Sequence, residues 1–191
     1  MAHPTEVLIL QHPLEVHNAK GTVRLLHLSL ARSRLAVGEV FDASALQNLL
    51  WAPWDAPIQS VQPAQPPRCT VLLYPSGPQD AAQGWASPAP LDLAGWQAPQ
   101  PLRLVVLDGT WRKTRKMLHL NPALQPLPRL PLAQLPPSRY RIRKAHQPHQ
   151  LSTLEATCAA LAQLDGGADA INPLLAAFEG FVAQQAAYQG R

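Results

Sequence analysis

The chain has 191 residues, a length typical of one domain, and 47% of them are hydrophobic, which is enough for a buried core. Its formal net charge of +4 and sequence pI near 9.4 are modestly basic, which suits a polyanionic partner without requiring one. The 21 prolines concentrate in the stretches that connect predicted helices and strands, so they do not indicate a disordered chain. Ten of the sixteen Lys and Arg lie between Arg103 and Lys144, so we expect the basic surface to be local.

The cysteines are Cys69 and Cys158, and two isolated cysteines provide neither a zinc site nor a disulfide framework. Both stand in apolar patterns, so we expect buried thiols. The sequence shows no signal peptide and no apolar run of about 18 residues. It therefore predicts a protein of the cytoplasm with no membrane partner and no metal.

Strand and helix patterns alternate along the chain. In chain order they predict a strand at 7–10, a helix at 23–31, a strand at 35–40, a helix from 43 to about 50, strands at 69–74 and 104–107, a helix from 111 to about 120, and helices at 153–164 and 173–188. The long Pro- and Gly-rich connection at 79–101 is typical of a functional loop. This alternation predicts an α/β domain of three layers with a mostly parallel sheet.

Polar residues at defined spacings mark the starts of several helices. Asp42 and Thr110 are expected N-caps. Ser152 and Glu155 have the spacing of a capping box, which by itself explains both residues structurally. Asn172, followed by Pro173, is expected to begin the last helix.

The strand at 104–107 ends abruptly in Asp108-Gly109-Thr110-Trp111. Ligands of open α/β sheets bind beyond the carboxyl ends of the strands, where Asp108 stands, and Gly109 lets the backbone turn sharply. The stretch 12–15, His-Pro-Leu-Glu, follows the first strand at the equivalent position. Both stretches are candidate parts of a ligand site, and for the stretch 12–15 an ordinary loop and helix cap is the alternative.

The helix after Thr110 carries cations where they are unfavourable. Arg112 and Lys113 fall in its first turn, where the helix dipole penalises each cation by roughly 0.3–1 kcal/mol. One face is expected to carry Arg112, Arg115, Lys116 and His119, and the opposite packing stripe Trp111, Thr114, Met117 and Leu118. An anionic partner explains this arrangement, and a solvated charged face is the alternative.

The stretch from Arg139 to Arg143 alternates strictly, with Tyr140 and Ile142 on one side and three arginines, including Arg141, on the other. Such a stripe can hold phosphates and stack a base. An edge strand protected by its charges is the alternative interpretation.

The motif Asp108-x-Thr110-Trp111 resembles the signature of the DTW-domain family, the tRNA-uridine aminocarboxypropyltransferases. Three further stretches resemble the same family in the same order: His12-Pro13-Leu14-Glu15, Leu73-Tyr74-Pro75, and Ser138-x-Tyr140-x-x-Arg143 leading to Ser152-Thr153-Leu154-Glu155-Ala156. Together they span most of the chain. The chain departs from the family pattern before Val7, where members carry a Cys-rich, metal-binding segment and this sequence has six residues without cysteine.

The resemblance implies one DTW domain over residues 1–191 with a SPOUT-like fold and a trefoil knot near the carboxyl end. It also implies an S-adenosylmethionine cofactor and a tRNA substrate. The 3-amino-3-carboxypropyl group would be transferred to N3 of a uridine, and methylthioadenosine would leave. The sequence does not distinguish a monomer from a homodimer.

The resemblance gives three sets of candidate site residues. The catalytic set is Asp108, as a general base, with Thr110 and Trp111. The cofactor set is Glu15, Leu73, Tyr74, Pro75, Ser76, Leu107, Tyr140, Arg143, Ser152, Thr153 and Glu155. The RNA-binding set is Arg112, Lys113, Arg115, Lys116, Arg139 and Arg141.

Two other functions fit the same residues. A SPOUT-type RNA methyltransferase would release S-adenosylhomocysteine in place of methylthioadenosine. A non-catalytic RNA-binding protein is compatible with the missing metal segment. The carboxylate of Asp108 beside a basic helix disfavours the second, because a pure binder has no use for an acid next to phosphates.

Overall fold

Four parallel strands form one sheet in the order β2-β1-β4-β3. The structure is a computed structural model that describes residues 4–18, 21–54, 69–75, 84–85, 91, 102–132, 138, 151–165 and 169–189. The strands are β1 (Glu6–Gln11), β2 (Ser33–Val37), β3 (Cys69–Leu73) and β4 (Leu102–Asp108). All residues of the two central strands, β1 and β4, are buried, as expected for strands covered on both faces.

Alternate side chains of each central strand enter two different cores. In β1, Val7 and Ile9 pack into one core, and Leu8 and Leu10 pack into the other. The cores lie on opposite faces of the sheet because successive side chains of a strand point to opposite faces. The middle of each central strand is therefore apolar on both faces, and the buried polar residues Glu6, Gln11, Arg103 and Asp108 lie toward the strand ends.

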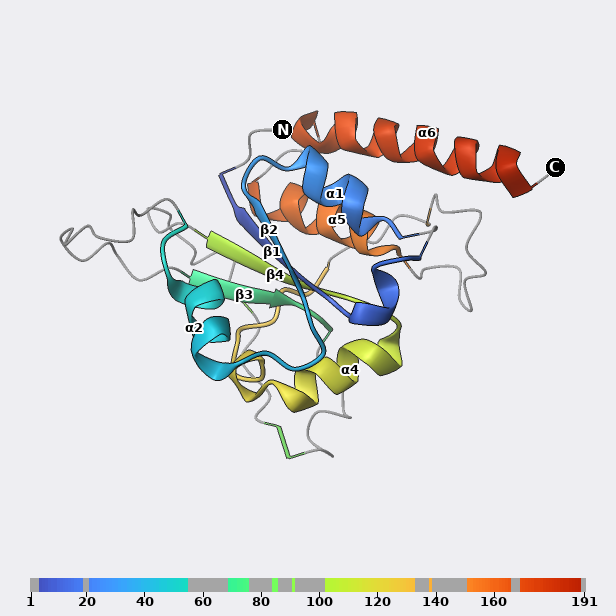
Figure 1. The fold of residues 1–191 in the computed structure, drawn as a ribbon. Helices are drawn as coiled ribbons and strands as arrows, with labels where there is room; N and C mark the ends of the chain where they lie inside the picture. The colour runs from blue at the N-terminus through green and yellow to red at the C-terminus, as the bar shows by residue number, and fades with distance from the viewer. Residues whose placement is uncertain are drawn as a thin grey trace.

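Helices cover both faces of the sheet (Figure 1). The first layer contains α1 (Val23–Ser29) and α5 (Thr153–Asp165), with α6 (Asn172–Gln189) packed outside them, and the second contains α2 (Ala43–Trp51) and α4 (Trp111–Leu120). Short 3-10 helices occupy Pro13–Glu15 (η1), Pro122–Leu124 (η2) and Asp169–Ile171 (η3). The expected three-layer α/β architecture with a parallel sheet is confirmed. No helix of the described segments is long and apolar enough to cross a membrane.

The sheet has a topological switch point between β1 and β4. These neighbouring strands are followed by helices on opposite faces, α1 on the side of one core and α4 on the side of the other. Such a divergence opens a crevice beyond the carboxyl ends of the two strands, the usual ligand position in this architecture. In Figure 1 the starts of α1, α4 and α5 converge there, at the right of the view.

The caps expected at the starts of α2 and α5 are present. The side chain of Asp42 accepts a hydrogen bond from the Ala45 N–H at 2.9 Å. Ser152 and Glu155 form both halves of a capping box, since the Glu155 N–H donates to Ser152 Oγ at 3.2 Å and the Ser152 N–H donates to Glu155 Oε2 at 2.8 Å. Local spacing was therefore sufficient to place the starts of α2 and α5.

Two predicted elements have different bounds. The helix expected to reach residue 31 ends at Ser29, because the Ser33 hydroxyl caps it by donating to the carbonyls of His27 and Leu30. The strand expected at 35–40 occupies Ser33–Val37, because the chain turns at Gly38. A Cβ on Gly38 would lie 2.9 Å from the ring of Phe41, so this turn is tightly packed.

Two predictions of burial were wrong. Trp111, expected on the packing stripe of its helix, is 52% exposed, whereas Thr114, Met117 and Leu118 are buried as expected. Cys69 begins the edge strand β3 and is only partly buried, unlike Cys158. Burial raises the pKa of the Cys158 thiol to about 12, so it stays protonated at neutral pH.

Candidate active site

Asp108 lies at the switch point, where two uncharged donors hold its carboxylate. The register pairs it with Gln11 at the end of β1, and the Gln11 amide donates to Asp108 Oδ2 at 3.0 Å. The Thr153 hydroxyl donates to Asp108 Oδ1 at 2.7 Å. Each oxygen therefore has one described donor, which fixes the plane of a carboxylate that is 8% exposed.

The start of α5 forms one wall of this site. Glu155 lies in its capping box and also accepts hydrogen bonds from the Ser138 hydroxyl at 3.1 and 3.0 Å, one to each carboxylate oxygen. The Leu154 N–H donates to Thr22 Oγ1 at 3.4 Å, which joins the starts of α5 and α1. Thr153 is thereby presented to Asp108 by a rigid helix start.

Gly109 is required by a close approach. Its φ lies outside the left-handed region, so the expected reason, backbone freedom for a sharp turn, is not the one that applies. A Cβ at this position would lie 3.1 Å from Lys113 Cβ and 3.5 Å from His12 Cβ. The tight approach is therefore to the first turn of α4, whereas the distance to His12 on the loop after β1 is an ordinary van der Waals contact.

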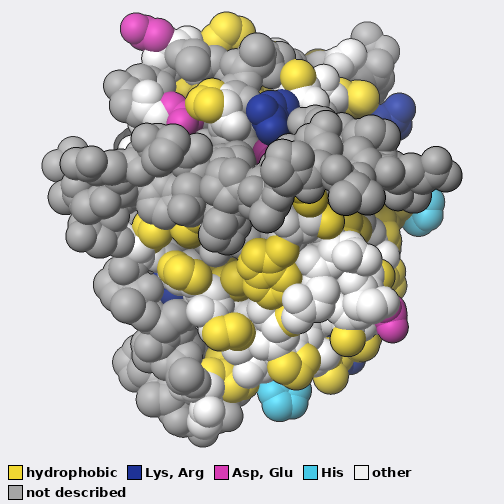
Figure 2. Space-filling model, turned by 90° about the vertical axis from the view of Figure 1, so that its left-hand side faces the viewer, with side chains coloured by type: hydrophobic (Ala, Val, Ile, Leu, Met, Phe, Trp, Pro, Cys, Tyr) yellow, Lys and Arg dark blue, Asp and Glu magenta, His cyan; other side chains and the backbone are white. Residues whose placement is uncertain are grey.

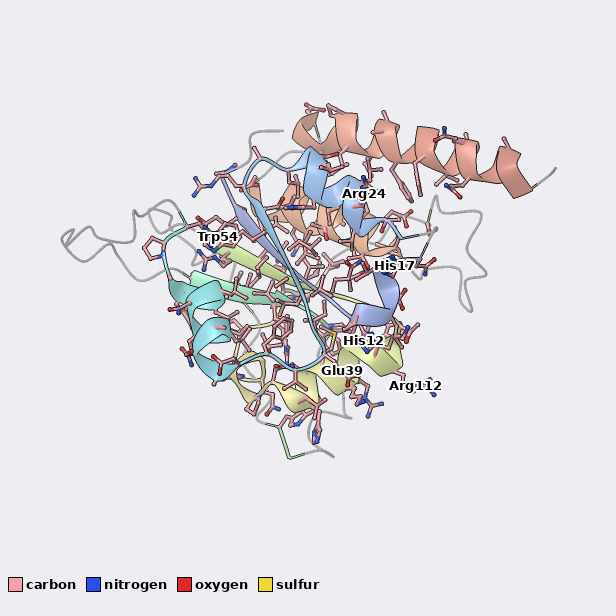
Figure 3. The ribbon with its side chains drawn as sticks, viewed as in Figure 1. His12, His17, Arg24, Glu39, Trp54 and Arg112 are labelled. Atoms are coloured by element: carbon pink, nitrogen blue, oxygen red, sulfur yellow. The ribbon has the colours of Figure 1, made fainter. Side chains whose placement is uncertain are left out.

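His12 is locked in place on the loop after β1. Its Nδ1 accepts the Leu14 N–H at 3.1 Å, so Nε2 carries a proton and donates to Glu39 Oε1 at 2.9 Å. The other oxygen of Glu39 pairs with Lys116 Nζ at 2.8 Å. Hydrogen bonds from Lys116 and then His12 lower the pKa of Glu39 below its ordinary value. Figure 3 shows His12 and Glu39 together beside α4.

Glu15, an expected cofactor contact, pairs with Lys113, an expected RNA contact. Lys113 Nζ lies 2.7 Å from Glu15 Oε1, and the Asn18 amide donates to Glu15 Oε2 at 3.0 Å. Burial alone would raise the pKa of Glu15, but the hydrogen bonds from Lys113 and Asn18 and the charge of Lys113 outweigh it, so the pKa is lowered. The pair ties η1 to the first turn of α4.

An aromatic pair lies at the start of α4. The rings of Tyr74 and Trp111 meet edge to face with centroids 5.6 Å apart and an interplanar angle of 70°. Tyr74 is 7% exposed and Trp111 is 52% exposed, so about half of the Trp111 surface faces solvent. Thr110 caps the same helix through its hydroxyl, which accepts the Lys113 N–H at 3.4 Å.

The remaining expected site residues lie at the ends of β3 and β4, on α4, or outside the described residues. Leu107 is buried at the end of β4, Leu73 ends β3 and is partly buried, and Pro75 is exposed just beyond it. On α4, Arg112 is exposed and Arg115 is partly buried. Ser76, Arg139, Tyr140, Arg141 and Arg143 lie outside the described residues.

Sequence reasoning missed Gln11, Glu39 and Asn121. Gln11 carried a usable signal, because a polar residue directly after an apolar strand points to the same edge as Asp108. Asn121 is 2% exposed and links α4 to the loop of Glu39. Its amide donates to the carbonyls of Glu39 at 2.9 Å and Met117 at 2.6 Å, and its Oδ1 accepts the Phe41 N–H at 2.9 Å.

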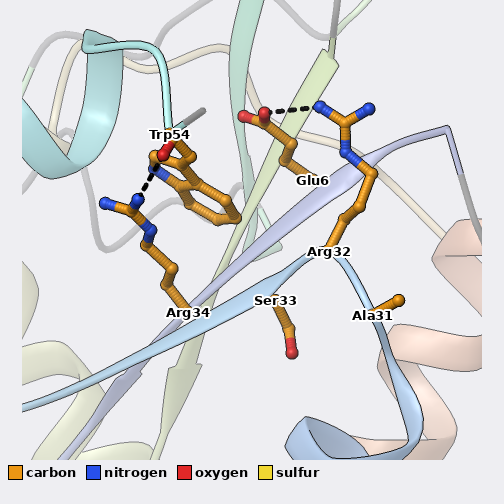
Figure 4. A pocket seen from close by; sticks show the side chains of 6 residues that line it. All are labelled: Glu6, Ala31, Arg32, Ser33, Arg34 and Trp54. Carbon is orange, nitrogen blue, oxygen red and sulfur yellow. Dashed lines mark hydrogen bonds and ion pairs between the residues drawn. The ribbon is translucent and has the colours of Figure 1, made fainter. Parts of the chain in front are cut away.

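A small cavity of about 130 Å³ lies at the opposite, amino-terminal edge of the sheet (Figure 4). It is lined by Glu6, Ala31, Arg32, Ser33, Arg34 and Trp54. Its charged groups are engaged with one another, since Arg32 pairs with Glu6 at 2.8 Å and Arg34 donates to the Trp54 carbonyl at 2.8 Å. No cluster of three His, Cys, Asp or Glu that could hold a metal occurs among the described residues.

The fold and the site define an α/β domain with an acidic residue and a basic helix at its switch point. The sequence model of the DTW domain matches residues 1–186, and the chain belongs to this family.

Two relatives carry names that describe an activity. The chain is 31% identical over 176 residues to tRNA-uridine aminocarboxypropyltransferase 2 of Drosophila melanogaster, covering 86% of this chain and 60% of that protein. It is 32% identical over 117 residues to tRNA-uridine aminocarboxypropyltransferase A of Arabidopsis thaliana, covering 60% of this chain and 40% of that protein. The chain thus spans about half the length of these relatives. No solved structure matches it significantly.

Proposed function

We propose that this protein is a tRNA-uridine aminocarboxypropyltransferase that uses S-adenosylmethionine as the donor. The observation that carries the proposal is Asp108 at the switch point, oriented by Gln11 and Thr153 in the signature motif of a family with two relatives of that name. The product would be a uridine carrying a 3-amino-3-carboxypropyl group on N3.

The chemistry of the residues at the switch point fits this donor. Its methionyl carboxylate needs N–H groups or cations, and at the start of α5 the Thr153 N–H is the candidate, since the N–H groups of Ser152, Leu154 and Glu155 bond within the protein. Its ammonium needs an acceptor, for which Glu15 is the candidate. Tyr74 and Trp111 offer an aromatic surface for the adenine, with Leu73, Pro75 and Leu107 nearby. The finer assignment of Ser76, Tyr140, Arg143 and Glu155 to the same pocket is part of the proposal.

S-adenosylmethionine, when bound, supplies an electrophilic γ-carbon and leaves as methylthioadenosine. The task of the protein is to hold the uridine at that carbon and to remove its N3 proton as the carbon–nitrogen bond forms. Asp108 is the proposed base, and hydrogen bonds from Gln11 and Thr153 orient its carboxylate for that role. Thr110 and Trp111 position the start of α4 beside it.

We also propose that the fold belongs to the SPOUT class, with a trefoil knot formed near the carboxyl end. The support is the parallel sheet with its ligand site at the switch point and the membership in the DTW family. A crystal structure tests this. A segment before α5 that passes through a loop would support the knot, and a segment that passes through none would refute it.

The test is to incubate unmodified tRNA with S-adenosylmethionine and the protein, and to analyse both nucleoside products by mass spectrometry. We expect modified uridine and methylthioadenosine. S-adenosylhomocysteine in place of methylthioadenosine would identify a methyltransferase, and neither product would identify a non-catalytic protein.

The Asp108→Asn variant tests the role of the carboxylate. It keeps the shape of the side chain, and we expect turnover to fall about 10²–10⁴-fold, the usual contribution of a general base. Thr157→Val is the matched control, because the Thr157 hydroxyl bonds only the Thr153 carbonyl among described partners. Near-normal turnover of Asp108→Asn would refute the role of base.

A further inference from the structure

We propose that His12 is a positioning residue, whose neutral ring caps η1 and thereby holds Glu15 in place for the donor. The inference rests on the proposed function for what Glu15 binds, the ammonium of S-adenosylmethionine. It gives the side chain of His12 a role, and it ties that role to one protonation state of the ring.

The main chain of His12 connects the proposed base to the proposed donor contact. Its N–H donates to the Asp108 carbonyl at 2.9 Å, and its own carbonyl accepts the Glu15 N–H at 2.9 Å. His12 is 5% exposed, so the residue that makes both bonds is largely shielded from water. A shift of His12 would therefore move Glu15 relative to the end of β4.

The ring of His12 adds two hydrogen bonds that one tautomer makes at the same time. Nδ1 accepts the Leu14 N–H at 3.1 Å, and because a backbone N–H can only donate, this nitrogen carries no proton. Nε2 lies 2.9 Å from Glu39 Oε1 and donates its proton there. A proton gained at Nδ1 would keep the bond to Glu39 and remove the acceptor that caps η1.

The short helix η1 depends on such a cap. It consists of the three residues Pro13–Glu15, and none of them is buried, so packing contributes little to its position. The bonds that hold its side chains and its first turn are the cap on Leu14 and the pair between Glu15 and Lys113 at 2.7 Å. Loss of the cap should therefore loosen Glu15 even while the rest of the domain stays folded.

The described charges around the ring are paired with one another. Glu39, on the loop after β2, lies against Nε2 and pairs with Lys116 of α4 at 2.8 Å. Glu15, on η1, pairs with Lys113 of α4, and β4 contributes Asp108, which meets the ring's own residue through its carbonyl. A proton gained by the ring would therefore act first on the cap of η1.

This arrangement is local to one side of the molecule. Figure 2, which views the molecule from the left-hand side of Figure 1, away from the site, shows mainly hydrophobic and uncharged side chains among the described residues. On the loop after β1, His17 is exposed and has no hydrogen bond or ion pair with another described residue. Figure 3 shows it apart from His12 and Glu39, so it is a matched control histidine on the same loop.

The experiment measures the affinity for S-adenosylmethionine by calorimetry without tRNA, at about pH 7.5 and about pH 5.5, the interval in which histidines change charge. The proteins are the wild type, His12→Asn, His12→Gln, His12→Ala and His17→Asn. Asparagine keeps an acceptor for the Leu14 N–H and does not titrate. The longer glutamine amide reaches toward Glu39 in place of Leu14, and alanine keeps neither bond.

At the higher pH, His12→Asn should bind the donor within about twofold of the wild type, whereas His12→Gln and His12→Ala should bind about tenfold more weakly, the usual effect of a lost cap. The two amides carry the same polar group, so a difference between them reports which bond is made and not a general loss of packing. Lowering the pH should weaken binding to the wild type and to His17→Asn about fivefold more than to His12→Asn, because an amide gains no proton.

Nitrogen NMR of the histidine rings gives a second measurement that needs neither donor nor RNA. It should find His12 as the Nε2–H tautomer at neutral pH, and an Nδ1–H tautomer would overturn the inference. The inference would also be wrong if His12→Asn bound the donor as weakly as His12→Ala, or if its affinity fell with pH as that of the wild type does.

The outcomes separate this inference from the proposed function. Normal donor affinity in every His12 variant, together with normal transfer to uridine, would overturn the positioning role and leave the proposed function standing. The expected affinities without any transfer to uridine would refute the proposed activity and leave the positioning role standing. A wild-type protein that binds no S-adenosylmethionine would refute both.

Discussion

The two edges of the sheet bury carboxylates in different ways. At the amino-terminal edge, Glu6 and Arg103 are both 0% exposed and bond at 2.9 and 2.6 Å. Arg103 also donates to the carbonyls of Leu49 and Ala52 and lies 4.3 Å from the centroid of the Trp54 ring. At the carboxyl-terminal edge, Asp108 is 8% exposed, and its described donors are an amide and a hydroxyl.

This difference indicates that the Glu6 carboxylate serves the stability of the fold, whereas the Asp108 carboxylate is a candidate for a role in the reaction. The Arg103 guanidinium pairs with Glu6 where neither side chain reaches solvent, so removing one partner alone would leave an uncompensated buried charge. The two described donors of Asp108, an amide and a hydroxyl, orient its carboxylate at the end of β4, where the proposed function needs a proton acceptor. A variant at the amino-terminal edge should therefore change the free energy of unfolding, and a variant at Asp108 or its donors should change turnover.

The largest effect is expected from Arg103→Leu. Removing the guanidinium leaves Glu6 buried with the exposed Arg32 as its described ion-pair partner, and breaking a buried pair in this way costs roughly 3–5 kcal/mol. Denaturant unfolding measures the loss. Arg32→Ala is the control on the same carboxylate, where the 41% exposed guanidinium should contribute only about 0–1 kcal/mol. Equal costs for the two variants would contradict the view that Arg103 is the structural partner.

A smaller loss of stability is expected from Asn121→Ala, at the end of α4. The variant removes three hydrogen bonds, to Glu39, Met117 and Phe41, at a site that is 2% exposed, which costs roughly 1–3 kcal/mol. The control is Gln125→Ala, whose partly buried amide donates to carbonyls of the same helix end at 3.1 and 3.3 Å. Thermal unfolding should place this control nearer the wild type, and a larger shift for Gln125→Ala would contradict the role of Asn121.

Thr153→Val tests whether the Asp108 carboxylate must be oriented. Valine keeps the shape of threonine but loses the hydroxyl that donates to Asp108 at 2.7 Å. We expect kcat to fall about tenfold while KM for tRNA is unchanged, because a misplaced base affects the reaction and not RNA binding. Thr157→Val, one turn further along α5, is the matched control for a lost hydroxyl. A raised KM with normal kcat would instead indicate that Thr153 contacts substrate.

The sequence was informative where structure depends on neighbouring residues. The capping box of Ser152 and Glu155 follows from three-residue spacing, and the two-sided burial of β4 follows from an unbroken apolar run. The pairing of Gln11 with Asp108 could not be predicted, because it depends on β1 and β4 being neighbours in register. The ion pairs of Glu15 and Glu39 with α4 likewise join residues 98 and 77 positions apart, which local spacing does not specify.

The smallest effect is expected from Glu15→Gln combined with Glu39→Gln, and it depends on pH. Both carboxylates have pKa values below their ordinary value of 4.5, Glu15 because its partners outweigh the effect of burial and Glu39 because of Lys116 and His12. A lowered pKa means that the folded protein gains stability from the ionised group above the unfolded pKa and loses it as pH falls through the folded pKa.

The unfolding temperature of the wild type should therefore exceed that of the double variant near neutral pH. The difference should shrink as the pH falls below about 4.5 and should also shrink at high salt, because these pairs are partly exposed. A difference that stayed constant with pH would show that the pairs hold η1 and the loop of Glu39 by packing and not by charge.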